Sequence, residues 1–315
     1  MRVCLVWLEW PEKCFRVDAE ALRALRGMVA KGTRVVRAKN EDEFLRALPR
    51  AAQVITWHFR EEWFAHAPQL RVLATPAAGR ELVPAKGPRG VKVHFGGFHG
   101  QIISETVLGF VLAWAHGFFR TGPLWPRERR ADDCRGLKGT TAVVLGFGRI
   151  GRAIGARLEG FGVRTVGVTR HGVFDGSAAK TPRKGLRVPY ARADYLVCAL
   201  PADTGTDSLV DARMLKRLPP RAVVVNIGRG NCIDEAALLT ALRRGKIAAA
   251  YLDVFRNEPT VLNPAAGKGK VAKDDLANLD ARHLPPNLIR MPHASAFAPE
   301  YLRLCFEELK DEGLI

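Results

Sequence analysis

Three side chains with charged or titratable groups follow short β-rich runs in the second half of the chain. Arg229 follows Val-Val-Val-Asn-Ile-Gly, Glu258 follows Leu-Asp-Val-Phe-Arg-Asn, and His293 follows Met-Pro. An arginine fork can clamp a carboxylate and polarise a keto oxygen. A protonated histidine can donate to that oxygen, and a nearby carboxylate raises the histidine pKa. Together the three residue types suit anion binding combined with proton transfer, whereas each alone also suits a surface arginine, a turn before proline or a hydrogen-bonded histidine.

A glycine-rich hexapeptide lies between a predicted strand and a predicted helix. Its residues are Gly146, Phe147, Gly148, Arg149, Ile150 and Gly151. In such a GxGxxG run the first glycine permits a tight turn, the second lets the backbone approach a pyrophosphate, and the third allows close packing of helix on strand. The N-terminus of the helix offers N–H groups to the anion. This unit predicts a dinucleotide-binding site.

The end of the next predicted strand, residues 165–168, bears on the choice of cofactor. NAD sites of this type carry an acidic residue here for the ribose 2′-hydroxyl, whereas NADP sites carry a cation for the 2′-phosphate. The chain has Thr169, Arg170 and His171 in place of an acid. Because Arg170 can form a charge-assisted fork with a phosphate, we expect NADP(H). NAD(H) is the alternative if Arg170 is only a solvated loop charge.

The elements that must position these residues alternate between strand and helix. The predicted strands are residues 2–7, 33–37, 53–56, 70–75, 91–95, 141–145, 165–168, 195–200, 222–226, 247–252 and 287–291. Asp18 as N-cap and Gly32 as a stop flank the first helical pattern, and the apolar stretch 106–119 predicts a long buried helix. Strand–helix–strand alternation at this spacing predicts parallel sheets. The expected fold class is α/β, with two doubly wound parallel-sheet domains.

The chain of 315 residues is long enough for two cores. A last helical pattern, 299–309, follows the closing strand, and we expect it to return to the first domain. The predicted substrate domain is therefore discontinuous, with residues 1–98 and 293–315. The predicted dinucleotide-binding domain is 99–292.

The segments described above, in this order behind Gly-Phe-Gly-Arg-Ile-Gly, resemble the D-isomer-specific 2-hydroxyacid dehydrogenase family, most densely from Ser104 to Ser295. The resemblance implies a flavodoxin-like substrate domain, a Rossmann cofactor domain and a cleft between them. It implies reduction of a small 2-keto acid, as in glyoxylate and hydroxypyruvate reductases. Arg229 resembles the substrate-binding arginine, Glu258 the acid that supports the histidine, and His293 the catalytic acid/base.

The resemblance assigns further residues by position. Besides the glycine loop and Thr169–His171, the expected cofactor contacts are Pro201, Thr206, Ile227 and Asp253, the last of which holds the nicotinamide carboxamide. Ala78 and Gly79 resemble the loop whose backbone amides bind the substrate carboxylate. Ser104 and Glu105 resemble the start of the domain-crossing helix, which also builds the dimer interface, so a homodimer is expected.

The chain departs from the family pattern in several places. Trp57, His58 and Phe59 are bulky where members often carry small or basic residues, which predicts a compact or aromatic-walled substrate pocket. The stretch 260–286 makes the spacing before His293 longer than usual and predicts an irregular basic loop. The chain ends soon after Leu309, which predicts an abbreviated C-terminal return. The keto acid itself stays open among glyoxylate, hydroxypyruvate and larger 2-keto acids.

Composition excludes several other classes of protein. The net charge is +17, but Lys and Arg are spread out without dense runs interleaved with aromatics, which disfavours nucleic-acid binding. The apolar stretch is too short to span a bilayer and the N-terminus resembles a strand rather than a signal peptide, so we expect a cytoplasmic protein without a membrane partner. Six scattered cysteines predict reduced, mostly buried thiols and no metal site.

Two other functions stay open from the sequence. Some relatives of the family are dinucleotide-binding corepressors, so a sensing scaffold without turnover is one alternative. A dehydrogenase acting on another small anion is the second. Formate enzymes of this fold carry Gln in place of the supporting acid, so Glu258 disfavours formate as the substrate. Phosphite is harder to exclude.

Overall fold

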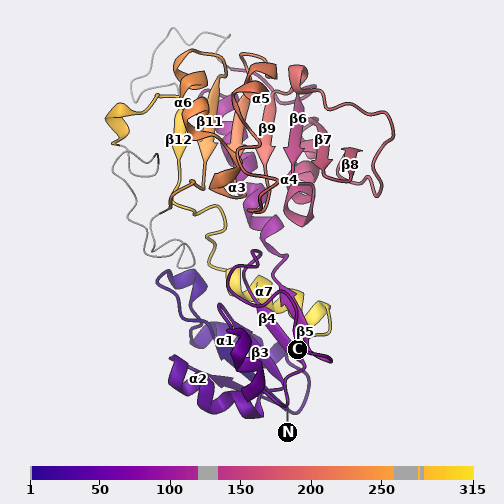
Figure 1. The fold of residues 1–315 in the computed structure, drawn as a ribbon, viewed down its shortest axis with the longest axis vertical. Helices are drawn as coiled ribbons and strands as arrows, with labels where there is room; N and C mark the ends of the chain where they lie inside the picture. The colour runs from indigo at the N-terminus through magenta and orange to yellow at the C-terminus, as the bar shows by residue number, and fades with distance from the viewer. Residues whose placement is uncertain (1, 120–133, 259–275, 277–279) are drawn as a thin grey trace. The chain divides into compact units, whose positions relative to one another are not determined.

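The structure, a computed structural model, describes residues 2–119, 134–258, 276 and 280–315. The chain forms two units, each with its own sheet (Figure 1). Unit 1 comprises Met1–His99 and Phe297–Ile315, and unit 2 comprises Gly100–Ala296. The chain passes from one unit to the other twice, after His99 and after Ala296. Most of the basic loop predicted at 260–286 lies outside the described residues.

Unit 1 is built on a five-stranded sheet in the order β2-β1-β3-β4-β5. The strands are β1 (Arg2–Trp7), β2 (Thr33–Arg37), β3 (Gln53–Thr56), β4 (Val72–Thr75) and β5 (Lys92–Phe95). All neighbouring strands run parallel. This order is that of the flavodoxin-like doubly wound fold, so the predicted class is confirmed for this unit.

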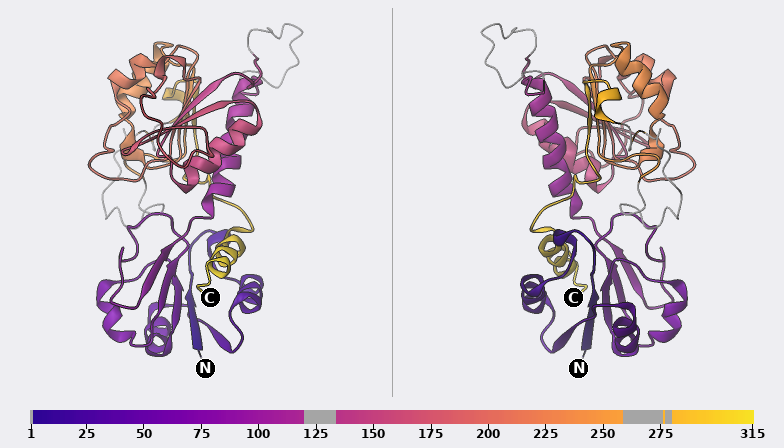
Figure 2. Two further views of the ribbon diagram at one scale, coloured as in Figure 1. Left: turned by 90° about the vertical axis from the view of Figure 1, so that its right-hand side faces the viewer. Right: turned by 90° about the vertical axis from the view of Figure 1, so that its left-hand side faces the viewer.

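Alternate residues of the unit 1 strands are buried on opposite faces of the sheet. The helices of this unit are α1 (Ala19–Met28), α2 (Glu41–Ala47) and α7 (Tyr301–Asp311). Leu5 and Trp7 share a core with Phe44 of α2, whereas Cys4 and Val6, also fully buried, point to the other face. There α1 packs against α7 (Figure 2). As predicted, Asp18 caps α1, accepting a hydrogen bond from the amide of Ala21 at 2.9 Å.

Unit 2 holds a seven-stranded sheet in the order β12-β11-β10-β9-β6-β7-β8. The strands are β6 (Thr141–Leu145), β7 (Arg164–Thr169), β8 (Gly172–Asp175), β9 (Tyr195–Cys198), β10 (Val223–Asn226), β11 (Ala249–Leu252) and β12 (Leu288–Arg290). They are parallel except β8, which pairs antiparallel with β7. The sequence analysis missed β8 because this four-residue run begins with glycine and ends with aspartate, both of which are depleted in strands. The Rossmann class is confirmed.

Helices cover both faces of the unit 2 sheet (Figure 2). They are α3 (His99–Ala115), α4 (Arg149–Gly160), α5 (Ala212–Arg217) and α6 (Glu235–Arg243). Ala142 and Val144 of β6 share a core with α3 and α4. Their neighbours Val143 and Leu145 share the other core with α5 and α6. Successive residues of one strand thus serve two cores, as a parallel sheet covered on both sides requires.

The long helix α3 starts earlier than predicted. His99 opens it, so Ser104 and Glu105 lie inside the helix rather than at its start. Both bind Arg157 of α4: its Nε lies 2.6 Å from Oγ of Ser104 and its Nη2 lies 2.8 Å from a carboxylate oxygen of Glu105. The run at 99–101 is polar and contains a glycine, so the sequence did not predict the first turn of this helix. Glycine suits position 100 because a β-carbon there would lie only 3.0 Å from Cβ of Ala153.

The remaining regular elements are short. Turns of 3-10 helix lie at Lys13–Phe15, Leu48–Arg50, Glu61–His66, Tyr190–Arg192, Gly230–Cys232 and Ala281–His283. All six cysteines are free and four of them are buried, as predicted. Within the residues described, no helix combines the length and the apolar character needed to cross a bilayer.

Candidate active site

One edge of the unit 2 sheet carries most of the predicted site residues. Strand ends deliver Gly146 after β6, Thr169–His171 after β7, Pro201 after β9, Ile227 and Arg229 after β10, Asp253 after β11 and His293 after β12. The carboxyl ends of parallel strands meet at the same edge, which is where open α/β sheets bind ligands. The structure therefore gathers at one edge residues that are widely separated in sequence.

His293 and Glu258 form a hydrogen-bonded pair. Nδ1 of His293 lies 3.0 Å from Oε2 of Glu258, while Oε1 of Glu258 accepts a hydrogen bond from the amide of Phe255 at 3.1 Å. The Glu258 side chain is 8% exposed and that of His293 39%. The carboxylate is therefore held at both oxygens and shielded from water, and the imidazole directs its other nitrogen, Nε2, away from it.

The surroundings of His293 favour its protonated form. Burial lowers the pKa of His293, but the hydrogen bond and the charge of Glu258 outweigh burial, and the charge of Asp253 adds to them. The positive charge of Arg229 lowers the pKa of His293, so the two side chains interact electrostatically. The net pKa is raised above the usual histidine value, in the direction predicted from the sequence.

The backbone at His293 has an uncommon conformation. Its φ is +54°, and only Ser208 shares a positive φ among the non-glycine residues described. For a residue with a β-carbon, this left-handed conformation is less favourable by about 1–2 kcal/mol. The amide of His293 donates to the carbonyl of Asp253 at 2.8 Å, which helps to hold the turn.

Asp253 supports the same turn with its side chain. Its carboxylate is buried, and it accepts hydrogen bonds from the amides of Ala294 at 2.8 Å and Ser295 at 3.1 Å. Ser295 is itself fixed by the hydroxyl of Tyr251 at 3.2 Å and by Thr106, whose hydroxyl donates to its carbonyl at 3.0 Å. Sequence reasoning missed these supporting roles because partners so far apart in the chain leave no local pattern.

Arg229 lies in a turn that two glycines make possible. A β-carbon on Gly230 would lie 1.8 Å from the carbonyl carbon of Phe255, and one on Gly228 would lie 2.5 Å from the carbonyl oxygen of Leu200. The buried side chain of Asn226 holds this turn: it donates to the carbonyl of Arg229 at 3.1 Å and accepts from the amide of Gly228 at 3.2 Å. The half-buried Arg229 side chain is thus presented by a rigid backbone.

The glycine-rich loop has the geometry that a pyrophosphate requires. Gly146 has a φ of +88°, and a β-carbon there would lie 2.4 Å from the carbonyl oxygen of Ala199. A β-carbon on Gly151 would lie 2.1 Å from the carbonyl oxygen of Gly146. Gly148, the N-cap of α4, is exposed and has open space at its β-carbon position. Arg149 and Ile150 begin α4, whose first-turn amides have no acceptor within the helix, so the loop fits a phosphate group approaching Gly148.

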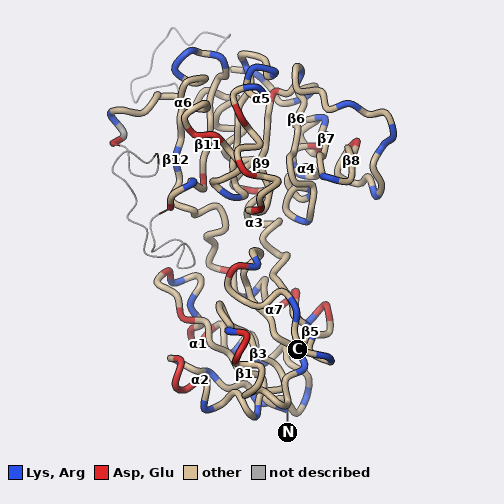
Figure 3. Tube along the Cα trace, in the orientation of Figure 1, with Lys and Arg blue, Asp and Glu red and all other residues tan. Residues whose placement is uncertain are grey.

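Arg170 stands in the tight turn between β7 and β8. It and His171 are exposed, with Nε of Arg170 3.3 Å from Nε2 of His171, and the hydroxyl of Thr169 accepts from the amide of His171 at 3.1 Å. Asp175, the last residue of β8, pairs with Val166 in the ladder and so lies toward the other end of the hairpin from this turn. It binds Arg164 at 3.1 Å and Arg183 at 2.5 Å, which hold its pKa below the usual value. Figure 3 shows basic residues along β7 and the segment that follows β8. The turn itself, residues 169–172, carries Arg170 and no carboxylate, so it suits an anion.

The loop after β9 is closed by Thr206. Its buried hydroxyl donates to the carbonyl of Pro201 at 2.8 Å and accepts from the amide of Asp203 at 3.0 Å. Ile227 is buried, and its amide donates to the carbonyl of Cys198 at 3.1 Å. Both segments thus have fixed backbones at the ligand-binding edge.

Ala78 and Gly79 belong to unit 1, in the turns after β4. Ala78 is exposed, and no hydrogen bond found between described residues uses the amide of either residue. The carbonyl of Ala77 accepts from the amide of Gly96 at 3.0 Å, which fixes the start of this loop. Trp57 and Phe59 are buried in unit 1, where Phe59 belongs to the hydrophobic core, and His58 is half-buried; the aromatic-walled pocket stays a prediction.

Comparison with known proteins gives consistent matches. The model of the D-isomer specific 2-hydroxyacid dehydrogenase NAD binding domain matches residues 112–295, more than half of the chain. A glyoxylate reductase of Thermococcus gammatolerans is 31% identical over 72% of this chain and 78% of its own length. The chain belongs to the D-isomer specific 2-hydroxyacid dehydrogenase family. As a member it is a dehydrogenase that uses a nicotinamide dinucleotide.

Further relatives of this dehydrogenase agree in sequence and fold. A glyoxylate/hydroxypyruvate reductase B of Pectobacterium atrosepticum is 29% identical over 76% of this chain and 73% of its own length. The crystal structure of a D-isomer specific 2-hydroxyacid dehydrogenase family protein from Aeromonas salmonicida matches with a TM-score of 0.71 and 28% identity, over 100% of this chain and 97% of that one. The NAD complex of the enzyme from Lactobacillus delbrueckii has a TM-score of 0.76 at 15% identity, over 99% and 96% of the two chains, which shows the fold alone.

Proposed function

We propose that this dehydrogenase uses NADPH to reduce a small 2-keto acid to the D-2-hydroxy acid, with His293 as the acid. The observation that carries the proposal is the His293–Glu258 pair, in which a shielded carboxylate raises the pKa of an imidazole at the ligand-binding edge of the sheet. A raised pKa keeps this proton donor charged up to a higher pH than an ordinary histidine. Such a group suits the reductive direction.

The residues of unit 2 fit a dinucleotide. The loop from Gly146 to Gly151 would hold the pyrophosphate, and the segments at Thr169–His171, Pro201–Thr206, Ile227 and Asp253 would hold the remainder. A bound nicotinamide supplies the hydride that reaches the keto carbon. NADP preference rests on the exposed Arg170 and on the absence of a carboxylate from the turn at residues 169–172. NAD(H) remains the competing cofactor.

The protein groups then manage charge and protons. Arg229 binds the substrate carboxylate and polarises the keto oxygen, a role for which a planar guanidinium is suited. In unit 1, the amides of Ala78 and Gly79 are assigned to binding of a substrate carboxylate. As the carbon gains its hydride, Nε2 of His293 gives its proton to the oxygen, and the neutral imidazole remains hydrogen-bonded to Glu258 through Nδ1. Solvent restores the proton afterwards.

The substrate class follows from the relatives. The names glyoxylate reductase and glyoxylate/hydroxypyruvate reductase belong to proteins that align over most of this chain. We therefore place glyoxylate and hydroxypyruvate first among the 2-keto acids to be tried. A homodimer is part of the proposal, because Phe118 and Phe119, after α3, are 65% and 47% exposed in the single chain. Sedimentation equilibrium of the full chain would test it, and a monomer at micromolar concentration would refute it.

The decisive experiment follows NADPH and NADH oxidation with a panel of 2-keto acids. The wild type should turn over at least one acid, faster with NADPH, and His293→Ala should lose at least about 100-fold in kcat, as expected for removal of a general acid. His283→Ala is the matched control, because His283 is exposed in the same unit. Turnover retained by His293→Ala would overturn the assignment. Absence of turnover in the wild type despite measured dinucleotide binding would overturn the proposed reaction.

A further inference from the structure

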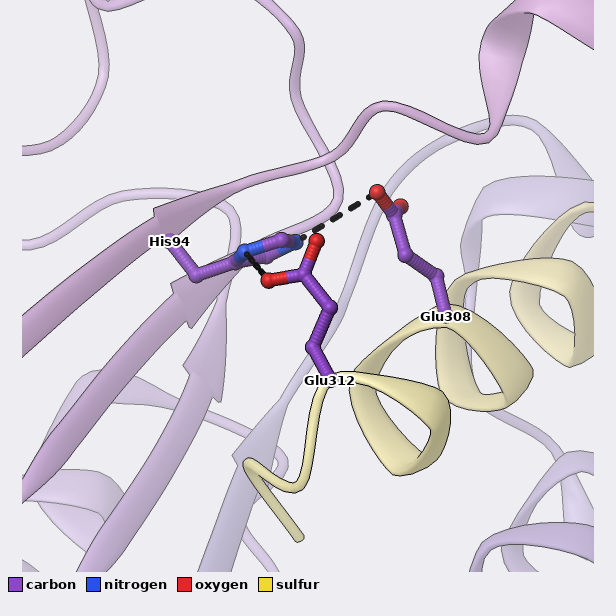
Figure 4. A group of neighbouring side chains, drawn as sticks. All are labelled: His94, Glu308 and Glu312. Atoms are coloured by element: carbon purple, nitrogen blue, oxygen red, sulfur yellow. Dashed lines mark ion pairs between the residues drawn. The ribbon is translucent and has the colours of Figure 1, made fainter.

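A histidine and two glutamates in unit 1, none of them assigned to catalysis, face one another (Figure 4). His94 lies in β5, Glu308 in α7 and Glu312 at the C-cap of α7. One nitrogen or oxygen from each residue can be chosen so that the three atoms lie within 4.8 Å of one another. We refer to these three residues as the β5–α7 cluster.

The imidazole of His94 is enclosed by the two carboxylates. Its side chain is 6% exposed; Nδ1 lies 3.2 Å from Oε2 of Glu312, and Nε2 lies 3.8 Å from Oε1 of Glu308. Nε2 is buried and has no hydrogen-bond partner among the described residues. Donation from Nδ1–H to Glu312 leaves the lone pair on Nε2, where it faces a carboxylate. A divalent cation bound at Nε2 would remove the repulsion between this lone pair and the carboxylate.

The two glutamates differ in how firmly they are held. Glu308 accepts hydrogen bonds from the amides of Gly97 at 2.9 Å and Phe98 at 3.0 Å, so its carboxylate is oriented before any ligand arrives. Burial raises the pKa of Glu308, but His94 and these amides outweigh burial, and the pKa lies below its usual value. The Glu312 side chain is 32% exposed, which opens the cluster to solvent. Lys92, with Nζ 3.9 Å from Glu312, offsets one of the two negative charges.

We propose that the β5–α7 cluster binds a divalent transition-metal cation of the zinc type, with Nε2 of His94 and an oxygen of Glu308 as protein ligands, water in the remaining positions and Glu312 as the carboxylate facing Nδ1. Zinc binds imidazole nitrogen and carboxylate oxygen at 2.0–2.2 Å, which places tetrahedral ligand atoms roughly 3.3 Å apart. The separation of 3.8 Å between Nε2 and Glu308 needs only a small closure to reach that value. The nitrogen ligand selects against Mg²⁺ and Ca²⁺, which take oxygen ligands.

The arrangement around His94 matches that of metal-binding histidines. Such a histidine donates its second ring N–H to a carboxylate, which fixes the tautomer and raises the basicity of the ligating nitrogen. Nδ1 and Glu312 stand in that relation. A cation here would join β5 to α7, two elements of unit 1 that are more than 200 residues apart in the chain. This separation also explains why no sequence pattern predicts the site.

The test is direct binding to the full chain after treatment with a chelator. Co²⁺ serves as the probe, with equilibrium dialysis for stoichiometry and visible absorbance for coordination. The wild type should take up one Co²⁺ that His94→Ala binds at least about 10-fold more weakly, and His66→Ala, an exposed histidine of the same unit, should match the wild type. Zn²⁺ at about 100 times its dissociation constant should raise the Tm of the wild type by roughly 5 °C and leave His94→Ala unchanged.

A second pair of variants guards against misfolding of His94→Ala. Glu312→Gln changes a partly exposed side chain and should also weaken Co²⁺ binding, whereas Glu307→Gln, on the neighbouring position of α7 that pairs with Arg303, should not. Equal Co²⁺ binding by the wild type and both cluster variants would place the metal elsewhere and overturn the proposal. Absence of Co²⁺ binding by the wild type would also overturn it.

Discussion

Replacing Glu258 by glutamine is expected to move the pH profile of keto-acid reduction to lower pH. Glutamine keeps the shape of the side chain and an acceptor for the amide of Phe255, but it removes the charge beside Nδ1 of His293. The hydrogen bond and the charge of Glu258 are what outweigh burial in raising the pKa of His293. Because the imidazolium is the donor, reduction is full below this pKa and is lost as pH rises through it. The variant should therefore lose activity earlier than the wild type.

The size of the effect follows from the pair itself. A hydrogen bond with a charged partner contributes about 1.5–3 kcal/mol. The His293 side chain is 39% exposed, so solvent screening favours the lower end of that range. A loss of about 1.4 kcal/mol is about a tenfold loss in kcat/KM. This tenfold difference should appear at pH values above both pKa values and should shrink below them, where His293 is protonated in both proteins.

The assay is kcat/KM for NADPH-dependent reduction of the best keto acid, measured across the range in which histidine titrates. Glu307→Gln is a control for loss of one carboxylate, because Glu307 pairs only with Arg303 among the described ion pairs and lies in unit 1. Its profile should superimpose on that of the wild type. If the midpoint for Glu258→Gln also coincides with the wild-type midpoint, Glu258 does not set the pKa of the catalytic acid, and the argument from the pair is wrong.

Three further predictions concern the cofactor loop and the turn after β12. Arg170→Ala should raise the KM for NADPH about 10- to 100-fold through loss of a charged hydrogen bond and leave that for NADH unchanged; equal effects in steady-state kinetics would refute NADP preference. Gly151→Ala should lower the Tm and abolish dinucleotide binding in calorimetry, because its β-carbon would lie 2.1 Å from a carbonyl oxygen. The control is Gly160→Ala, whose β-carbon meets open space and which should stabilise α4 by up to about 1 kcal/mol. Asp253→Asn should lower the free energy of unfolding in urea by about 1.5–3 kcal/mol; no change would show that the amides of residues 294 and 295 do not depend on its charge.

Apolar runs were enough to locate the strands because both sheets are covered on their two faces. The bounds of β1, β2, β3 and β6 are those predicted. The stretch predicted at 195–200 ends as a strand at Cys198, because the chain leaves the ladder there while Ala199 and Leu200 still pack against the cores. An apolar run thus predicts the position of a strand well. The last residue of the strand depends on backbone hydrogen bonds, which cannot be read from the composition.

The candidate site was predictable as a set of strand ends but not as a set of contacts. Arg229, Glu258 and His293 could be placed near one edge because parallel strands end together. The turn at Arg170 was expected to be a loop, and the structure closes it with β8. A positive φ at His293 could not be read from the residue type, because only a few per cent of non-glycine residues adopt this conformation, even though histidine is among the more tolerant ones.

The segment that follows β11 holds His293, the proposed proton donor, in two independent ways. Its first residue, Asp253, binds the backbone of the turn after β12, through its carbonyl to the amide of His293 and through its carboxylate to the next two amides. Five residues later, Glu258 binds the ring of the same histidine. The backbone contacts stabilise a left-handed conformation that histidine would otherwise avoid, and the ring contact determines which nitrogen faces Glu258. Because both residues also raise the pKa of His293, one short segment determines the position, the orientation and the charge of the proton donor.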